Sequence, residues 1–233
     1  MMKKNDLDGI ELVITITNSD YDPTILTSNF LINNNIVPEE WINGQQVICE
    51  SNVSQVLFHD RVNIISRRNR ISFIESIDLK ALNNIKAPTI ALRYTDALTT
   101  LIDINYFSVD VTFKGYLVYP QYSDLPHKYI FETLIRPPIQ DWTEIGGSNI
   151  QGSLSFFYSF INRELKLSID EAMLKTSQGE ESPVLLLTGN FNYKISDKSS
   201  KNSGGENCKV IFGWLNDLEI YQKLVNRLLH LIE

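Results

Sequence analysis

The order of the predicted elements constrains this chain most, because the same order runs through it twice. A β-branched strand at residues 10–17 leads into a loop-rich segment, three closely spaced strands and a helix. A strand with clean period-two alternation at residues 106–119 leads into an irregular segment, three more strands and a long amphipathic helix. The inner strands are predicted at residues 47–58, 62–66, 70–75, 154–161, 165–173 and 184–195, and the helices at residues 88–102 and 210–232.

This order predicts an α+β fold with a mostly antiparallel sheet and the helices on one of its faces. It divides the chain into a β-x-β-β-β-α unit at residues 1–104 and a β-α-β-β-β-α unit at residues 105–233. We expect the two units to form one compact body. A polar, low-complexity stretch at residues 196–207 is predicted to be a flexible loop. Two interpretations stay open: an internal duplication, and an α+β domain whose order only resembles a repeat.

Composition and charge narrow the class of protein. With 43% hydrophobic and 21% charged residues among 233, the chain has the profile of an ordinary globular protein. This profile excludes a fully disordered chain, a collagen-like repeat and a long coiled coil. The formal net charge is -7, from 28 acidic and 21 basic residues. That balance disfavours tight binding along a nucleic-acid backbone, because such binders neutralise phosphates with Lys and Arg.

The sequence favours a cytoplasmic setting. It contains no run of about 18 apolar residues, the length that a membrane-spanning helix needs, so no membrane contact is expected. Lys3 and Lys4 are followed by acidic residues instead of the apolar core of a secretion signal. Cys49 and Cys208 lie far apart without CxxC spacing, so we expect reduced thiols rather than a disulfide.

The sequence contains no recognisable catalytic motif. The three histidines, His59, His127 and His230, form no HxH or HExxH pattern, so no metal site is predicted. The glycine pairs lack the GK[ST] of a phosphate-binding loop, and no GxSxG nucleophile elbow occurs. We therefore predict no catalytic residue and no cofactor, and we expect a protein other than an enzyme.

Four arginines form the basic cluster of the chain and are candidate binding residues. Arg61, Arg67, Arg68 and Arg70 fall on a predicted strand-turn-strand segment. Their guanidinium groups could present hydrogen-bonding forks to phosphates or to an acidic partner. The alternative is that these charges keep a hairpin turn soluble.

Two tryptophans are further binding candidates. Trp41 and Trp142 each follow a proline in the connector of their half of the chain. Tryptophan is common at the centres of protein interfaces, where it contributes much of the binding energy. The alternative is a partly buried side chain at the edge of the core.

These observations favour a non-catalytic protein-binding or assembly module, whose partner is another protein or a second copy of the chain. The wide apolar face of the last predicted helix and the lack of catalytic motifs support this hypothesis. The competing hypothesis is nucleic-acid or nucleotide binding through the Arg61–Arg70 hairpin, which the net charge of -7 disfavours. An enzyme with a diffuse site is the third hypothesis.

Part of the chain resembles a known group of proteins. The similarity lies in residues 30–41, 54–58 and 68–75, together with the run Leu92-Arg93-Tyr94. These segments resemble a sporadically distributed family of uncharacterised bacterial proteins of about this length, which share an LRY helix start and a C-terminal amphipathic helix. The resemblance implies a fold and a bacterial setting, and it carries no catalytic residue over to this chain.

Overall fold

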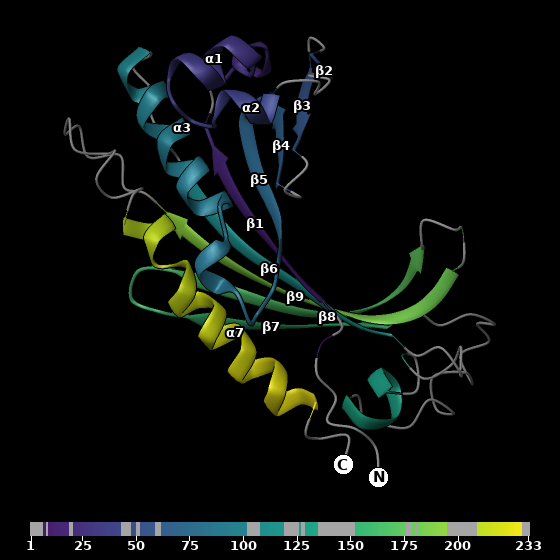
Figure 1. Cartoon of the computed structure of the whole chain (residues 1–233). Helices are drawn as coiled ribbons and strands as arrows, with labels where there is room; N and C mark the ends of the chain where they lie inside the picture. Colours follow the sequence, from purple (N-terminus) through teal and green to yellow (C-terminus); the bar gives the residue numbers. More distant parts are fainter. Residues whose placement is uncertain are drawn as a thin grey trace.

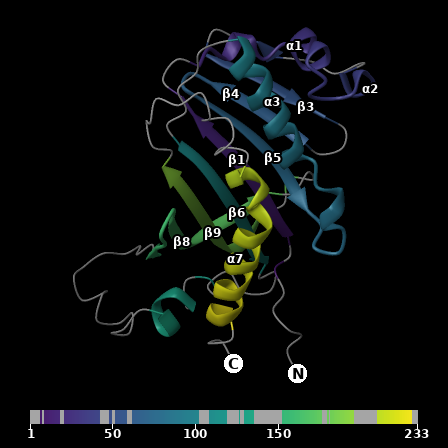
Figure 2. The ribbon, with the colours of Figure 1, turned by 90° about the vertical axis from the view of Figure 1, so that its left-hand side faces the viewer.

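The computed structural model describes residues 7, 9–18, 21–42, 48–49, 52–58, 62–101, 108–118, 126, 129–134, 152–175, 179, 181–194 and 209–229. Within these residues the chain forms one nine-stranded antiparallel sheet with helices on one face (Figures 1 and 2). The α+β fold class predicted from the sequence is therefore confirmed. The predicted loop at residues 196–207 and the predicted boundary between residues 104 and 105 lie outside the described residues.

The elements follow the predicted order. The first half contains β1 (Gly9–Thr17), η1 (Pro23–Ile25), α1 (Ser28–Asn33), α2 (Glu39–Ile42), β2 (Ile48–Cys49), β3 (Val53–Leu57), β4 (Val62–Arg67), β5 (Arg70–Ile77), η2 (Leu82–Asn84) and α3 (Ala87–Leu101). The second half contains β6 (Ser108–Val118), the π-helical η3 (Tyr129–Leu134), β7 (Ser153–Ser159), β8 (Glu164–Lys175), β9 (Glu181–Lys194) and α7 (Trp214–Leu229).

One predicted strand is wrong. The single strand expected at residues 47–58 is a hairpin, in which β2 pairs antiparallel with β3. Polar residues at positions 50–52 interrupt the alternation of this segment, and Asn52 lies in a bend between the two strands. Polar residues of this kind favour turns over a continuous strand.

The sheet has the strand order β2-β3-β4-β5-β1-β6-β9-β8-β7. Outward from its centre, the first half runs β1-β5-β4-β3-β2 and the second half runs β6-β9-β8-β7. Each half therefore places its first strand next to its last and its second strand farthest out. α3 packs against β1 and β5, and α7 packs against β6 and β9, so each half carries its closing helix on the same face (Figure 2).

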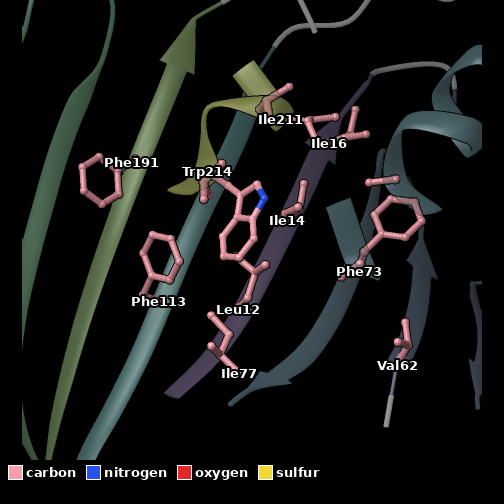
Figure 3. Close-up of a cluster of buried hydrophobic side chains, with 14 of the residues drawn as sticks. Leu12, Ile14, Ile16, Val62, Phe73, Ile77, Phe113, Phe191, Ile211 and Trp214 are labelled. Carbon is pink, nitrogen blue, oxygen red and sulfur yellow. The ribbon is translucent and has the colours of Figure 1, made fainter. Parts of the chain in front are cut away.

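The core lies between the sheet and these helices. Alternation in β1 places Ile10, Leu12, Ile14 and Ile16 on the helix side, where all four are buried. Figure 3 shows Trp214 of α7 beside this row of side chains. Complete burial of one such aliphatic side chain stabilises the fold by about 1.5–3 kcal/mol.

One buried tyrosine fixes each long helix to the sheet. Tyr94 of α3 packs edge-on against Phe73, with the ring centroids 5.6 Å apart. Tyr221 of α7 stacks on Phe113 with the ring centroids 5.5 Å apart. Both tyrosines are fully buried, and the Tyr221 hydroxyl donates to the Leu187 carbonyl at 2.9 Å. The helices are therefore held at fixed positions above the strands.

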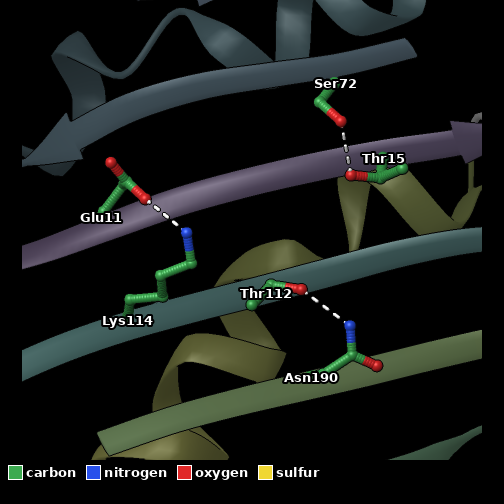
Figure 4. Close-up of polar contacts among 6 residues, drawn as sticks. All are labelled: Glu11, Thr15, Ser72, Thr112, Lys114 and Asn190. Carbon is green, nitrogen blue, oxygen red and sulfur yellow. Dashed lines mark hydrogen bonds and ion pairs between the residues drawn. The ribbon is translucent and has the colours of Figure 1, made fainter. Parts of the chain in front are cut away.

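The opposite face of the sheet, which we call the open face, carries polar contacts between neighbouring strands (Figure 4). Lys114 lies 3.0 Å from Glu11, and the hydroxyls of Thr15 and Ser72 are 2.9 Å apart. The side chains of this face in β1 and β6 are half-buried, while those of the helix side are buried. Cross-strand pairs of this kind each contribute a few tenths of a kcal/mol, up to about 1 kcal/mol.

Candidate functional site

The two edges of the sheet differ strongly. One edge is β2, which is only two residues long. The other is β7, which has seven residues and, among the strands that the structure describes, pairs only with β8. An edge strand presents unpaired backbone N–H and C=O groups, which another chain can bind, and natural proteins protect such edges with short strands, charged side chains or proline. The edge at β2 is protected in this way, because β2 is short.

β7 lacks these protections. Its sequence, Ser-Leu-Ser-Phe-Phe-Tyr-Ser, contains no charged residue and no proline. Phe157 is 76% exposed and Tyr158 is 36% exposed, and in the following turn Phe160 is 40% exposed and Ile161 is fully exposed. We call β7 together with Phe160 and Ile161 the β7 surface. An exposed patch of large apolar side chains is more often an interaction site than an ordinary part of the protein surface.

The register with β8 shows how the core continues into this edge. Leu154 lies opposite Ile169 and Phe156 lies opposite Leu167, on the helix side of the sheet. The two β8 residues are fully buried, whereas Leu154 and Phe156 are only half-buried. The apolar layer therefore reaches the last strand of the sheet, and within the described part of the chain it is covered less completely at β7 than at β8.

The turn between β7 and β8 is fixed by a buried polar cluster. The Arg163 guanidinium donates through Nη1 to the Tyr193 hydroxyl at 3.1 Å, and its Nη2 lies 3.3 Å from Oδ1 of Asp217. The Tyr193 hydroxyl donates to Oδ2 of Asp217 at 2.7 Å. Asp217 lies in the first turn of α7 and Tyr193 on β9, so the cluster ties the turn to two other elements.

The same arginine also positions an exposed aromatic ring. The centre of the Arg163 guanidinium lies 5.1 Å from the centroid of the Phe160 ring, within the range of a cation–π contact. The backbone N–H of Phe160 donates to the Arg163 carbonyl at 2.9 Å, which closes the turn. Phe160 is therefore held in place on the β7 surface by contacts within the chain.

Burial controls the protonation of this cluster. Burial raises the pKa of the Asp217 carboxyl, while the hydrogen bond from Tyr193 and the charge of Arg163 act in the opposite direction. Burial also raises the pKa of the Tyr193 hydroxyl far above its usual range, and the neighbouring Asp217 raises it further. Tyr193 therefore stays protonated and keeps its hydrogen bond to Asp217. This arrangement is suited to holding a turn rigid.

The structure places two of the four candidate arginines next to each other. Arg67 ends β4 and Arg70 begins β5, where the two are direct cross-strand neighbours. Together with Ser72 they line a shallow hollow on the open face, whose floor includes Val13. These arginines and Arg68 of the turn are exposed. None of them forms an ion pair with a residue that the structure describes. Arg61 lies outside the described residues.

The tryptophan candidates do not join this hollow. Trp41 of α2 is half-buried and packs against Phe58 with the ring centroids 5.5 Å apart. The ammonium group of Lys86 lies 4.3 Å from the centroid of the Trp41 ring. Trp41 thus lies at the edge of the core, in contact with other residues of the same chain. Trp142 lies outside the described residues.

The sequence analysis did not identify the β7 surface. It placed a strand at residues 154–161, and the structure has β7 at Ser153–Ser159. Local alternation cannot show which strand ends up at the edge of a sheet, because strand order is set by long-range pairing. One signal was available: seven consecutive strand residues without a charge.

The described residues contain no cluster of three or more His, Cys, Asp or Glu side chains arranged to hold a metal ion. Within the same residues, no helix combines the length and the apolar character needed to cross a bilayer. No protein-family model matches this chain, and no curated protein does. Candidate functions therefore rest on the geometry of the chain itself.

Proposed function

We propose that this chain is a non-catalytic protein-binding module of the cytoplasm, and that the β7 surface is its contact site. The observation that carries the proposal is a seven-residue, uncharged edge strand that leaves Phe157 76% exposed and continues into a fully exposed Ile161. An edge with these properties is a template on which another polypeptide can add a strand.

The binding mode follows from the two sides of the strand. The outer backbone groups of β7 would hydrogen-bond to an extended segment of the partner, which supplies affinity that depends little on sequence. Leu154, Phe156 and Tyr158 would contact apolar side chains on the helix side, and Phe157 would contact the partner on the open face. Because Arg163 fixes the adjoining turn, little ordering of the chain is needed on binding.

Photo-crosslinking tests this proposal inside the cells that make the protein. Benzoylphenylalanine is placed at Phe157 in one variant and at Phe212 in a control variant, since Phe212 is 69% exposed on the α7 side of the molecule. We expect a discrete crosslinked protein from position 157 and none from position 212. Equal adducts from both positions, or no adduct from position 157, contradict the proposal.

A second candidate function is binding of a phosphate-bearing ligand, such as a nucleotide or a nucleic acid, in the hollow at Arg67 and Arg70. The observation that favours it is the cross-strand placement of two exposed arginines beside the Ser72 hydroxyl. Two guanidinium groups at one site suit phosphate oxygens, which they can hold through paired hydrogen bonds.

Fluorescence anisotropy with a labelled single-stranded oligonucleotide, and calorimetry with ATP, test this second function. The double variant Arg67→Glu/Arg70→Glu, which reverses both charges of the hollow, should abolish any binding that the wild type shows. Lys209→Glu/Arg227→Glu is the matched control, because it also reverses two charges, at exposed positions outside the hollow. Absence of binding by the wild type, or equal loss in both variants, removes this candidate.

A further inference from the structure

We infer that the occupant of the β7 surface is a second copy of this chain, paired with β7 as an antiparallel strand about a twofold axis at Phe156. This inference rests on the proposed function, for which it names the partner. It joins two nine-stranded sheets edge to edge into one continuous sheet. A twofold interface uses the same patch on both copies, so β7 must be complementary to itself.

The sequence of β7 meets this condition on the helix side. With Phe156 on the axis, Leu154 of one copy lies opposite Tyr158 of the second copy, and the two Phe156 side chains lie opposite each other. All of these side chains belong to the face on which β8 presents the buried Leu165, Leu167 and Ile169. The half-buried apolar layer of each copy is therefore continued by the other copy.

The open face is complementary as well. Phe157 lies opposite Ser155 of the second copy, so each large ring meets a small side chain. Beyond the strand, Phe160 continues the helix-side positions and lies opposite Gly152 of the second copy, which has no side chain to oppose the ring. Large residues opposite small ones fill space without overlap, and an aromatic ring is a favourable cross-strand neighbour of glycine.

Charge supports a second copy over a charged partner. None of the residues Ser153–Ser159 is charged, so the pairing brings no like charges into opposition. The net charge of -7 makes each copy repel the other weakly at long range, and physiological salt screens that repulsion. A partner that required charged contacts would find none on β7 itself.

Sedimentation velocity of the full chain tests the pairing. We expect wild type to sediment as a dimer of its 26.7 kDa chain. In the twofold register, Ser155→Lys/Phe157→Lys places two like-charged pairs across the interface and should give a monomer. Ser155→Lys/Phe157→Glu places opposite charges across the interface and should remain dimeric. Both positions are exposed in the single chain, so the fold should tolerate these changes.

Phe212→Lys is the control for adding charge at an exposed aromatic residue, and it should remain dimeric. The inference is overturned if wild type sediments as a monomer up to millimolar concentration, a result that requires no variant. It is also overturned if the like-charged double variant dimerises as well as wild type. A monomeric wild type whose position 157 crosslinks to a different protein would overturn this inference and still support the proposed function.

Discussion

At the scale of single residues, close packing over two glycines fixes the position of α7. An added methyl group at Gly189 would lie 2.6 Å from Cδ2 of Tyr221, and one at Gly115 would lie 2.6 Å from the Tyr221 hydroxyl oxygen. Real carbon contacts are not this short, so the tyrosine would have to move. Tyr221 is fully buried and stacked on Phe113, and therefore it has little room to do so.

Gly189→Ala should consequently lower the free energy of unfolding by about 1–3 kcal/mol, the usual cost of overpacking a core. Urea denaturation followed by circular dichroism measures this change. Gly9→Ala is the control, since its nearest neighbours are the ring and hydroxyl of the half-buried Tyr116, at 3.0–3.2 Å. An equal loss for both variants would show that Tyr221 does not have the fixed position described here.

Buried tyrosines also give the fold a dependence on alkaline pH. Burial raises the pKa of Tyr21, Tyr193 and Tyr221 above the ordinary value of 10.0. The folded state therefore holds these protons more tightly than the unfolded state does. Their contribution to stability is complete below pH 10 and is lost as the pH rises above it.

We expect the free energy of unfolding to fall as the pH rises above about 10, and to fall less steeply in Tyr221→Phe. Urea titrations at a series of pH values measure this slope. A stability of the wild type that stays constant over this range would contradict the burial of these hydroxyls.

At the scale of elements, the sequence predicts well where each helix or strand lies along the chain. It predicts poorly which strands are neighbours in the sheet. The alternation at residues 106–119 located β6 at Ser108–Val118, and the apolar spacing at residues 88–102 located α3 at Ala87–Leu101. The hairpin of β2 and β3 was predicted as one strand, because the three polar residues at positions 50–52 were included in a continuous strand instead of being assigned to a turn. The edge position of β7 depends on pairing over long sequence distances, which no local pattern records.

Fewer features of the candidate site than of the fold could be predicted from the sequence. Arg67 and Arg70 were identified because their charge is visible in the sequence, and their position across a turn was implied by the predicted hairpin. The cluster of Arg163, Tyr193 and Asp217 joins three elements that are separated along the chain. Neither spacing nor composition could indicate it.

This cluster leads to a prediction about the β7–β8 turn. Asp217→Ala leaves the Arg163 guanidinium buried without its counter-charge, and should lower the free energy of unfolding by about 3–5 kcal/mol. Glu219→Ala, which breaks the exposed pair with Lys223 on the same helix, should cause no measurable change. Thermal and urea denaturation compare the two variants. Similar effects in both would contradict the buried role of Asp217.

At the scale of the whole molecule, the sheet repeats one strand order on both sides of its centre. α3 and α7 cover the same face, and each presents one fully buried tyrosine to the sheet. These parallels favour an internal duplication, one of the two interpretations that the sequence left open, and superposition of the two halves would test it. The outer edges of the two halves differ. The edge strand of the first half is the two-residue β2, and that of the second half is the longer, unprotected β7.

The central claim is that β7 pairs with a strand of another polypeptide, and that a second copy is sufficient. Amide hydrogen exchange of residues 153–159 in the purified wild-type chain tests it most directly, because outward-facing amides exchange slowly only when they are hydrogen-bonded. We predict that their exchange slows as the protein concentration rises, while exchange in β1 at the centre of the sheet stays constant. Rapid exchange of the outward-facing amides at every concentration would contradict this account.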